Sequence, residues 1–149
     1  MALISGLLLD THTWLWQQNQ ELKLSQELQD QMEQAAIGNA IFVSSFSFYE
    51  VANAVRKKRL HLRPDPKSWF AAAFSGRSVR VMDITPAISL KAAELPASFH
   101  GDPGDRIITA TAIVGNLTLL TNDTSLLRFG KQGLMKVTKV TKTRSAEIA

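Results

Sequence analysis

The sequence predicts an α/β domain built around a mainly parallel sheet of about five strands. Short apolar runs alternate along the chain with segments of helical periodicity, which is the pattern of parallel strands connected by helices. The first of these runs is continuously apolar, as expected of a strand that is buried on both faces. The 149 residues fit a single domain, and no internal repeat or long linker divides them.

The N-terminal part supplies the first two strands and three helices. Leu3–Leu9 is the continuous apolar run, and Ile41–Val43 is the second expected strand. Between them we expect a short helix over Thr11–Gln18 and a second helix that Ser25 caps. Ser47–Lys58 has apolar residues on one helical face and is expected to form the third helix.

Three later helices share one start signal, a capping residue followed by proline. Proline suits the first turn because its φ is already helical and an N–H there would have no partner in the helix. The signals are Asp65-Pro66, Thr85-Pro86 and Asp102-Pro103. We expect strands after the first and the third of these helices, at Val79–Met82 and Leu117–Leu120.

The C-terminal part is expected to hold a helical turn at Asp123–Leu127 and a last strand at Leu134–Val140. The residues that follow are polar and carry more basic than acidic groups. We therefore predict one domain over residues 1–140 and a polar basic tail over residues 141–149, which is a candidate for disorder.

Composition and hydropathy exclude several classes of site. The chain has no cysteine, which excludes disulfides, zinc sites with cysteine ligands, iron–sulfur clusters and a thiol nucleophile. Its three histidines are scattered and lack the spacing of metal ligands. The N-terminal apolar run lacks a basic start and stops at Asp10, and the longest uncharged stretches are shorter than the roughly 20 residues of a spanning helix. We therefore expect a cytoplasmic protein with no membrane segment.

The charge balance favours a partner rich in phosphate. Seventeen Lys and Arg residues against thirteen Asp and Glu residues give a net charge of +4. Basic residues concentrate in the run Arg56–Arg59 and after Arg128. Such patches bind nucleic acid by releasing counterions, although a solvated helix end and a polar tail would have the same composition.

Acidic residues follow the expected strands or begin the expected helices. These residues are Asp10, Glu50, Asp102, Asp105 and Asp123. Ligands of open α/β sheets bind outside the carboxyl ends of the strands, so all five acids are expected to face one crevice.

Clustered carboxylates repel one another unless a cation joins them. An all-oxygen site suits a hard divalent cation, Mg²⁺ or Mn²⁺. One or two such ions can activate a water for phosphodiester cleavage. The sequence therefore predicts a metal-dependent nuclease site in a basic protein.

Helix capping offers a different explanation for the same acids. Asp10 and Asp123 stand where each could cap a helix, and Asp102 stands three residues before Asp105 in the relation of a cap. Glu50 follows Ser47 at the spacing of a capping box. Capping and ligation are compatible because a helix N-terminus stabilises an anion.

Candidate substrate contacts lie beside the acids. Arg56 and Lys57 belong to the basic run, and Arg106 follows an acid that it could pair with instead. Thr121 and Asn122 precede Asp123 and could orient a water or an acid, although turn chemistry explains them equally well.

Four segments together resemble the PIN-domain family, most closely the VapC-like toxins of type II toxin–antitoxin modules. They are LLLDTHTWLW, SSFSFYEVANAVRKKRL, LPASFHGDPGDRIITATA and LTLLTND, in this order. The resemblance implies a three-layer α/β/α sandwich, a Mg²⁺- or Mn²⁺-dependent endoribonuclease that uses a metal-activated water, and a small antitoxin that blocks the site.

Carried over by position, the catalytic and metal-site acids of that family fall on Asp10, Glu50, Asp105 and Asp123, with Asp102 as an auxiliary metal ligand. The sequence departs from the family at Gly104, where relatives usually carry a bulky apolar residue, and at Gly101, where a basic residue is common. These departures bear on substrate contacts and on the fit of an antitoxin.

Two other classes remain open at this point. The chain could be a non-catalytic PIN-like module that binds RNA or a partner. A phospho-acceptor receiver domain also has an acid after its first strand, but it needs a pair of acids there, and Asp10 has no paired neighbour. A homodimer is a further open alternative, because exposed apolar helices of small domains often pair.

Overall fold

A computed structural model describes residues 6–76, 78–99 and 101–143. Five parallel strands form the sheet, in the order β4-β3-β1-β5-β6. The strands are β1 (Leu7–Leu9), β3 (Ile41–Ser44), β4 (Arg80–Met82), β5 (Thr118–Thr121) and β6 (Lys136–Lys139). The central strand β1 pairs through Leu8 with Phe42 on one side and Leu119 on the other. The first three residues of the expected strand Leu3–Leu9 lie outside the described residues.

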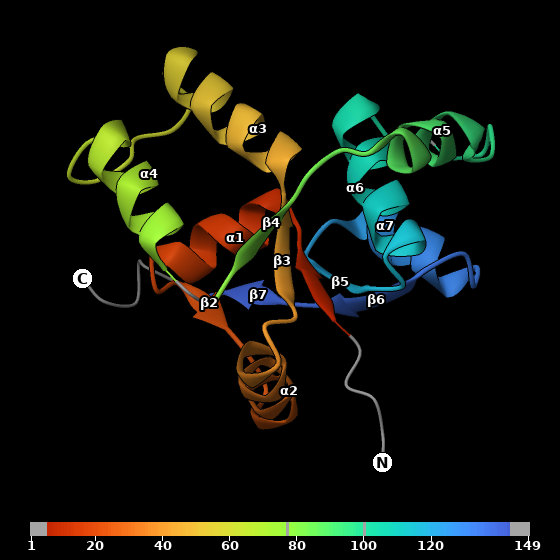
Figure 1. Cartoon of the computed structure of the whole chain (residues 1–149), viewed down its shortest axis with the longest axis horizontal. Helices are drawn as coiled ribbons and strands as arrows, with labels where there is room; N and C mark the ends of the chain where they lie inside the picture. Colours follow the sequence, from red (N-terminus) through yellow and green to blue (C-terminus); the bar gives the residue numbers. More distant parts are fainter. Residues whose placement is uncertain (1–5, 77, 100, 144–149) are drawn as a thin grey trace.

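Helices cover both faces of the sheet, which confirms the predicted fold class (Figure 1). They are α1 (Thr11–Gln18), α2 (Gln26–Ile37), α3 (Ser45–Arg56), α4 (Pro66–Ser75), α5 (Pro86–Glu94), α6 (Pro103–Val114) and α7 (Thr124–Lys131). Leu7 and Leu9 of β1 are buried in a core with α1, α2 and α4, whereas Leu8 is buried in a second core with α6 and α7. Because successive side chains of β1 point to opposite faces of the sheet, each face is covered by its own core and helices, and the domain has three layers.

Local capping chemistry sets the start of most helices. Ser25, Asp65, Thr85 and Asp102 are all N-caps whose side chains accept a backbone N–H, as the sequence predicts. The helical turn expected after Asp123 is a complete helix, α7, with Leu126 and Phe129 buried beneath it. Of these caps, Asp102 lies at the carboxyl edge of the sheet, where ligands of such folds bind, since it lines a cavity together with Asp10, the residue that follows β1.

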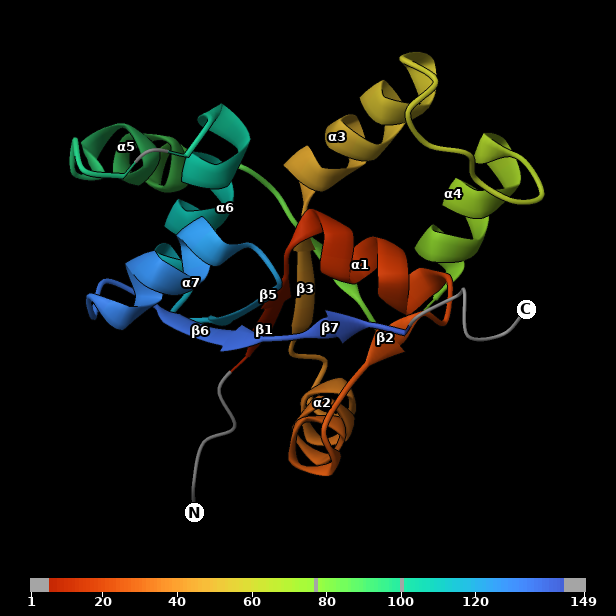
Figure 2. The same cartoon turned by 180° about the vertical axis from the view of Figure 1, so that it is seen from behind.

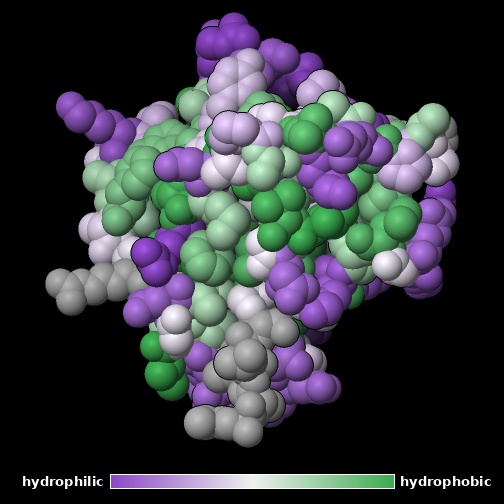
Figure 3. All heavy atoms as spheres, turned by 45° about the vertical axis from the view of Figure 1, so that its right-hand side comes forward, coloured by the Kyte–Doolittle hydropathy of each residue, from purple (hydrophilic) through white to green (hydrophobic). Residues whose placement is uncertain are grey.

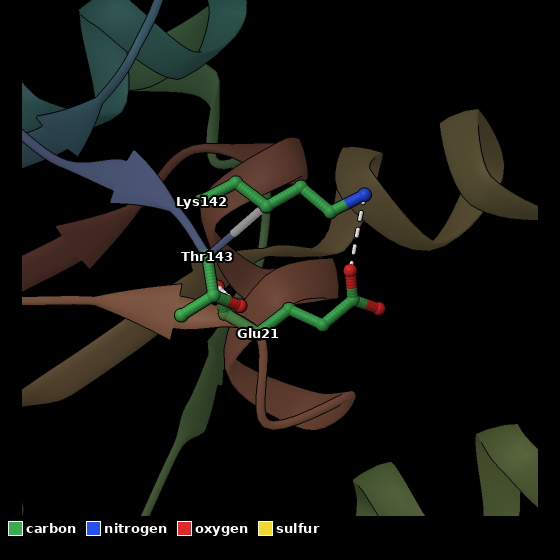
Figure 4. Close-up of polar contacts among 3 residues, drawn as sticks. All are labelled: Glu21, Lys142 and Thr143. Atoms are coloured by element: carbon green, nitrogen blue, oxygen red, sulfur yellow. Dashed lines mark hydrogen bonds and ion pairs between the residues drawn. The ribbon is translucent and has the colours of Figure 1, made fainter. Parts of the chain in front are cut away.

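A second, two-stranded antiparallel sheet joins β2 (Leu22–Lys23) to β7 (Thr141–Lys142). In Figure 2, β7 continues the line of β6 toward β2. Glu21 anchors this end of the chain. Its carboxylate pairs with Lys142 Nζ at 3.0 Å, and its carbonyl accepts hydrogen bonds from the backbone N–H and the hydroxyl of Thr143 (Figure 4).

The polar end of the chain therefore differs from the expected tail in its first residues. Residues 141–143 belong to the fold, three residues beyond the predicted domain boundary at 140. No hydrophobic pattern marked these residues, because β2 and β7 are held by backbone pairing and polar contacts. Residues 144–149 lie outside the described residues.

Some large apolar side chains remain on the surface. Val81 on the edge strand β4, Ile84 after it and Leu90 on α5 are exposed. Apolar groups also interrupt the hydrophilic surface in the view of Figure 3. In the described ranges, no helix combines the length and the apolar character needed to cross a membrane.

Candidate active site

The five acids singled out by the sequence line one cavity at the carboxyl edge of the sheet. The cavity has a volume of about 300 Å³ and also includes residues of α1 and α3. Its acidic side chains are Asp10, Glu50, Asp102, Asp105 and Asp123. They come from four separate segments of the chain, and the order of the strands brings them together because β3 and β5 flank β1. We call this hollow the acid cavity.

Asp10 is the most buried of these acids, with 8% of its surface exposed. It follows β1 and caps α1, and its Oδ1 accepts the backbone N–H of Thr11 at 2.8 Å. Its Oδ2 accepts the hydroxyl of Thr121 at 2.6 Å. Burial raises the pKa of Asp10, and the two hydrogen bonds offset part of that rise. Asp10 is therefore held in one orientation by β5 as well as by its own helix.

Glu50 lies in the second turn of α3 and is half-buried. The capping-box explanation for it is wrong, because α3 begins at Ser45 with Ser44 as its cap, three residues before Ser47. Instead, Glu50 Oε1 accepts the hydroxyl of Thr11 at 2.6 Å. Burial raises the pKa of Glu50, and the nearby charge of Asp10 raises it further.

Thr11 and Ser47 form a hydrogen-bonded chain that ends on Glu50. The two hydroxyl oxygens are 2.8 Å apart. Since the Thr11 hydroxyl donates its one hydrogen to Glu50, Ser47 donates to Thr11. Ser47 is fully buried. Thr11 is not among the candidate residues that the sequence offers, and Ser47 appears there only as a possible cap for the helix of Glu50. Their signal in the sequence is position, one next to the first acid and one a helical turn before the second.

Asp102 and Asp105 begin α6. Asp102 caps the helix by accepting the backbone N–H of Asp105 at 2.8 Å. Burial and the charges of the other four acids, with Asp102 the largest of these, raise the pKa of Asp105 to about 7. Of the three acids whose pKa the cavity raises, Asp105 is the one whose pKa all four of the other acids raise. Asp105 therefore lies where the negative potential of the cavity is concentrated.

Asp123 caps α7 by accepting the backbone N–H groups of Ser125 and Leu126 at 2.8 and 3.0 Å. The two residues before it bind the protein itself. Thr121 donates to Asp10 and accepts the backbone N–H of Asp123 at 3.0 Å. The amide of Asn122 donates to the carbonyl of Val140 at 2.6 Å. Thr121 thus connects two acids, whereas Asn122 fastens β5 to the end of β6.

The basic residues named by the sequence divide into two groups. Arg106 directs its guanidinium to the backbone carbonyls of four residues, Ala92, Ala93, Leu95 and Phe99. It therefore serves the fold, and we do not retain it as a substrate contact. Arg56 bonds the amide oxygen of Asn53 at 2.8 and 3.1 Å. Lys57 is exposed and lines a hollow next to the acid cavity.

The donor set matches the chemistry of a hard divalent cation. It consists of five carboxylates, the hydroxyl of Thr11 and the imidazole of His12, and the mutual repulsion of the carboxylates is what a cation would relieve. In the part of the chain that the structure describes, however, no three Asp, Glu or His side chains stand in an arrangement that could hold a metal ion directly. The residues fit a cation in type and in location, and the carboxylates must turn toward one another to bind it.

Comparison with known families and proteins gives a consistent result. The model of the PIN domain family matches residues 7–132. Ribonuclease VapC22 of Mycobacterium tuberculosis (strain ATCC 25618 / H37Rv) is 34% identical to this chain over 123 residues, which are 83% of this chain and 91% of that protein.

Two solved structures share the fold of this chain. VapBC2 from Rickettsia felis, bound to a DNA fragment from its promoter, superposes with a TM-score of 0.65 at 19% identity, covering 91% of this chain and 98% of that chain. A toxin–antitoxin complex from Klebsiella pneumoniae superposes with a TM-score of 0.52 at 19% identity, covering 80% and 88%. At these identities the likeness concerns the fold.

Proposed function

The chain belongs to the PIN domain family, and from this premise we propose that it is a VapC-type ribonuclease, the toxin of a toxin–antitoxin module. The observation that carries the proposal is the acid cavity, in which five carboxylates from four chain segments face one space. Similarity to Ribonuclease VapC22 over most of both chains supports the same activity.

Nucleases of this family are generally metal-dependent, and we propose that Mg²⁺ or Mn²⁺, as one or two ions, serves this one. Asp10, Glu50, Asp105 and Asp123 would hold the cation, with Asp102 as an auxiliary ligand. When bound, a divalent cation supplies a water of lowered pKa and offsets the charge that develops at the scissile phosphate.

The protein's own residues prepare the acids for this role. Thr121 and the backbone N–H of Thr11 bond to the ionised carboxylate of Asp10, which favours its charged form against burial. The Ser47–Thr11 chain does the same for Glu50. Backbone N–H groups at the starts of α6 and α7 donate to the carboxylates of Asp102 and Asp123 and so hold them in place.

We further propose a small cognate antitoxin as a protein partner and the cytoplasm as the place of action. The related structure from Klebsiella pneumoniae, which is a toxin–antitoxin complex, supports the first proposal. The second follows from an RNA substrate. An antitoxin that acts by blocking the site would have to cover the acid cavity, because no other place in the proposed mechanism holds the acids.

Cleavage of RNA by the purified protein tests the proposed function. We expect cleavage with Mg²⁺ or Mn²⁺, none in excess EDTA, and a fall of about 1,000-fold in Asp10→Asn, because lost ligation removes several kcal/mol of transition-state stabilisation. Asp65→Asn is the matched control, since Asp65 caps α4 away from the cavity and asparagine also caps helices.

Two results would contradict the proposal. Cleavage that persists unchanged in excess EDTA would refute the role of the metal. Absence of cleavage together with RNA binding that is insensitive to Mg²⁺ and to Asp10→Asn would favour a non-catalytic binding module. Circular dichroism of Asp10→Asn should match that of the wild type, so that a loss of activity is not a loss of fold.

A further inference from the structure

A second hollow, of about 380 Å³, opens beside the acid cavity along α3. The two share Glu50, Ala54 and Asp102, so they are adjacent and these three residues lie between them. The residues that belong to this hollow and not to the acid cavity are Phe46, Tyr49, Asn53, Lys57, Arg59, Pro103 and Gly104. We call it the α3 hollow. A chain molecule bound at the acids would therefore need to pass only these three residues to reach it.

Gly104 keeps the base of the α3 hollow open. A Cβ at this position would lie 2.7 Å from a ring carbon of Phe46 and 3.0 Å from Oε2 of Glu50. The absence of a side chain lets the Phe46 ring pack against the start of α6. A larger side chain at this position would displace the Phe46 ring. The wall of the α3 hollow therefore depends on Gly104 together with Phe46.

Two aromatic rings form the wall of the α3 hollow. The centroids of Phe46 and Tyr49 are 5.6 Å apart, with the ring planes tilted by 47°. Tyr49 is 60% exposed, whereas Trp14 and Trp69 are almost completely buried. A large aromatic face beside a nuclease site is available to stack on a base, and such stacking tolerates any base because every base has a π-face.

Two cations lie in the same hollow. Lys57 and Arg59 are exposed there, and neither forms an ion pair with any residue in the described ranges. Glu50 and Asp102 lie at the junction with the acid cavity. The junction would repel a phosphate in the absence of a metal, while Lys57 and Arg59 would attract one. The hollow is therefore negatively charged at its junction with the acid cavity and positively charged where Lys57 and Arg59 lie.

We propose that the α3 hollow binds one unpaired nucleotide of the RNA, next to the phosphate that is cleaved. Its base stacks on Tyr49 and Phe46, and its phosphate contacts Lys57 and Arg59. This inference rests on the proposed function, because it assigns the hollow to the same substrate. It also names the substrate class more closely, since a base can reach the aromatic wall only when it is not paired in a duplex.

Binding of two labelled probes to the Asp10→Asn protein, measured by fluorescence anisotropy, tests the proposal. One probe is a short oligouridylate, and the other is an abasic ribose-phosphate oligomer of the same length and charge. Tyr49→Ala should weaken oligouridylate binding by about 5- to 100-fold, because stacking on one aromatic ring accounts for that range. Binding of the abasic probe should stay unchanged, and Tyr49→Trp should keep the affinity for oligouridylate.

Phe74→Ala is the matched control. Phe74 is also an aromatic residue that is 60% exposed, but it lies on α4 and does not line the hollow, so the affinity for both probes should stay unchanged. The double variant K57A/R59A should weaken both probes and make the slope of log affinity against log salt shallower by about 0.7, because the one phosphate that both residues contact contributes about that much for a single strand.

The proposal is overturned if Tyr49→Ala binds oligouridylate as tightly as its parent, or if it loses affinity for the abasic probe to the same extent. Cleavage assays separate this failure from failure of the proposed function. A protein that cleaves RNA equally well with and without the Tyr49 ring is a nuclease without this subsite. A protein that shows the predicted binding pattern but cleaves no RNA retains the subsite and lacks the activity.

Discussion

The helices α3 and α6 approach the acid cavity from different sides of the sheet and use their basic residues in opposite ways (Figure 1). Each begins with a side-chain cap and places an acid in its first two turns, Glu50 on α3 and Asp105 on α6. Arg106 of α6 donates hydrogen bonds to backbone carbonyls of the protein, whereas Lys57, after α3, faces the solvent at the α3 hollow.

The difference shows that a basic side chain close to the acid cavity can serve either the fold or a ligand, depending on which acceptors lie around it. The carbonyls of Ala92, Ala93 and Leu95, at and just after the last turn of α5, lie over the start of α6 and need donors, since the last carbonyls of a helix have no partner within it. Arg106 satisfies them and also lies over the ring of Phe99, 5.6 Å from its centroid. The amine of Lys57 forms no ion pair with the residues that the structure describes, so it remains available to a ligand.

Removing Arg106 should give the largest change in stability. We expect Arg106→Ala to lower the free energy of unfolding by about 2–4 kcal/mol, because it removes charged hydrogen bonds to backbone carbonyls and a cation–π contact. Arg56→Ala is the matched variant on α3 and should cost less than about 0.5 kcal/mol, since its guanidinium lies on the surface. Urea denaturation of both variants measures the difference.

Equal destabilisation by the two variants would break the comparison, because it would mean that the carbonyls at the end of α5 do not depend on Arg106. If Arg106→Ala lost RNA affinity but kept its stability, the result would show that Arg106 contacts the substrate rather than supporting the fold.

The sequence predicts the meeting of the acids well because its signals are local. Asp10 and Asp123 each follow a strand that is recognisable from apolar residues alone, and Asp102 stands in a cap-and-proline signal. Because the strands are parallel, their carboxyl ends lie at one edge of the sheet, so residues that follow different strands in the sequence lie close together in the structure. The fold class follows from the same signals.

The parts that the sequence could not supply depend on contacts between distant segments. The hydrogen bond from Thr11 to Glu50 requires α1 to pack on α3, which no local pattern shows. The role of Arg106 depends on where α5 ends. The small sheet of β2 and β7 joins residues more than 100 positions apart, and only its backbone pairing identifies it.

A bulkier residue at the α6 side of the hollow should give an intermediate effect. We expect Gly104→Val to cost about 1–3 kcal/mol of stability, because its side chain would overlap the ring of Phe46 and approach Glu50. In a Phe46→Ala background the same substitution should cost at least about 0.5 kcal/mol less, since the space is then free. A double-mutant cycle from denaturation curves measures the coupling. Additive costs would show that Gly104 and Phe46 do not share the space between α3 and α6.

The smallest of the three effects concerns the acid that begins α6. The folded, metal-free protein raises the pKa of Asp105 to about 7, so between about pH 4 and pH 7 it binds a proton more readily than the unfolded chain does. The stability that this proton contributes is present at low pH and is lost as the pH rises through 7. Asp105→Asn carries no such charge, so its melting temperature in EDTA should exceed that of the wild type by more at pH 8 than at pH 5.5.

Asp65→Asn should show a constant difference over this range, because the backbone hydrogen bond from Ser68 lowers the pKa of Asp65 and leaves it ionised throughout. If the Asp105→Asn difference were equally constant, the repulsion that α3 and α6 create by bringing their acids together would be too weak to affect folding.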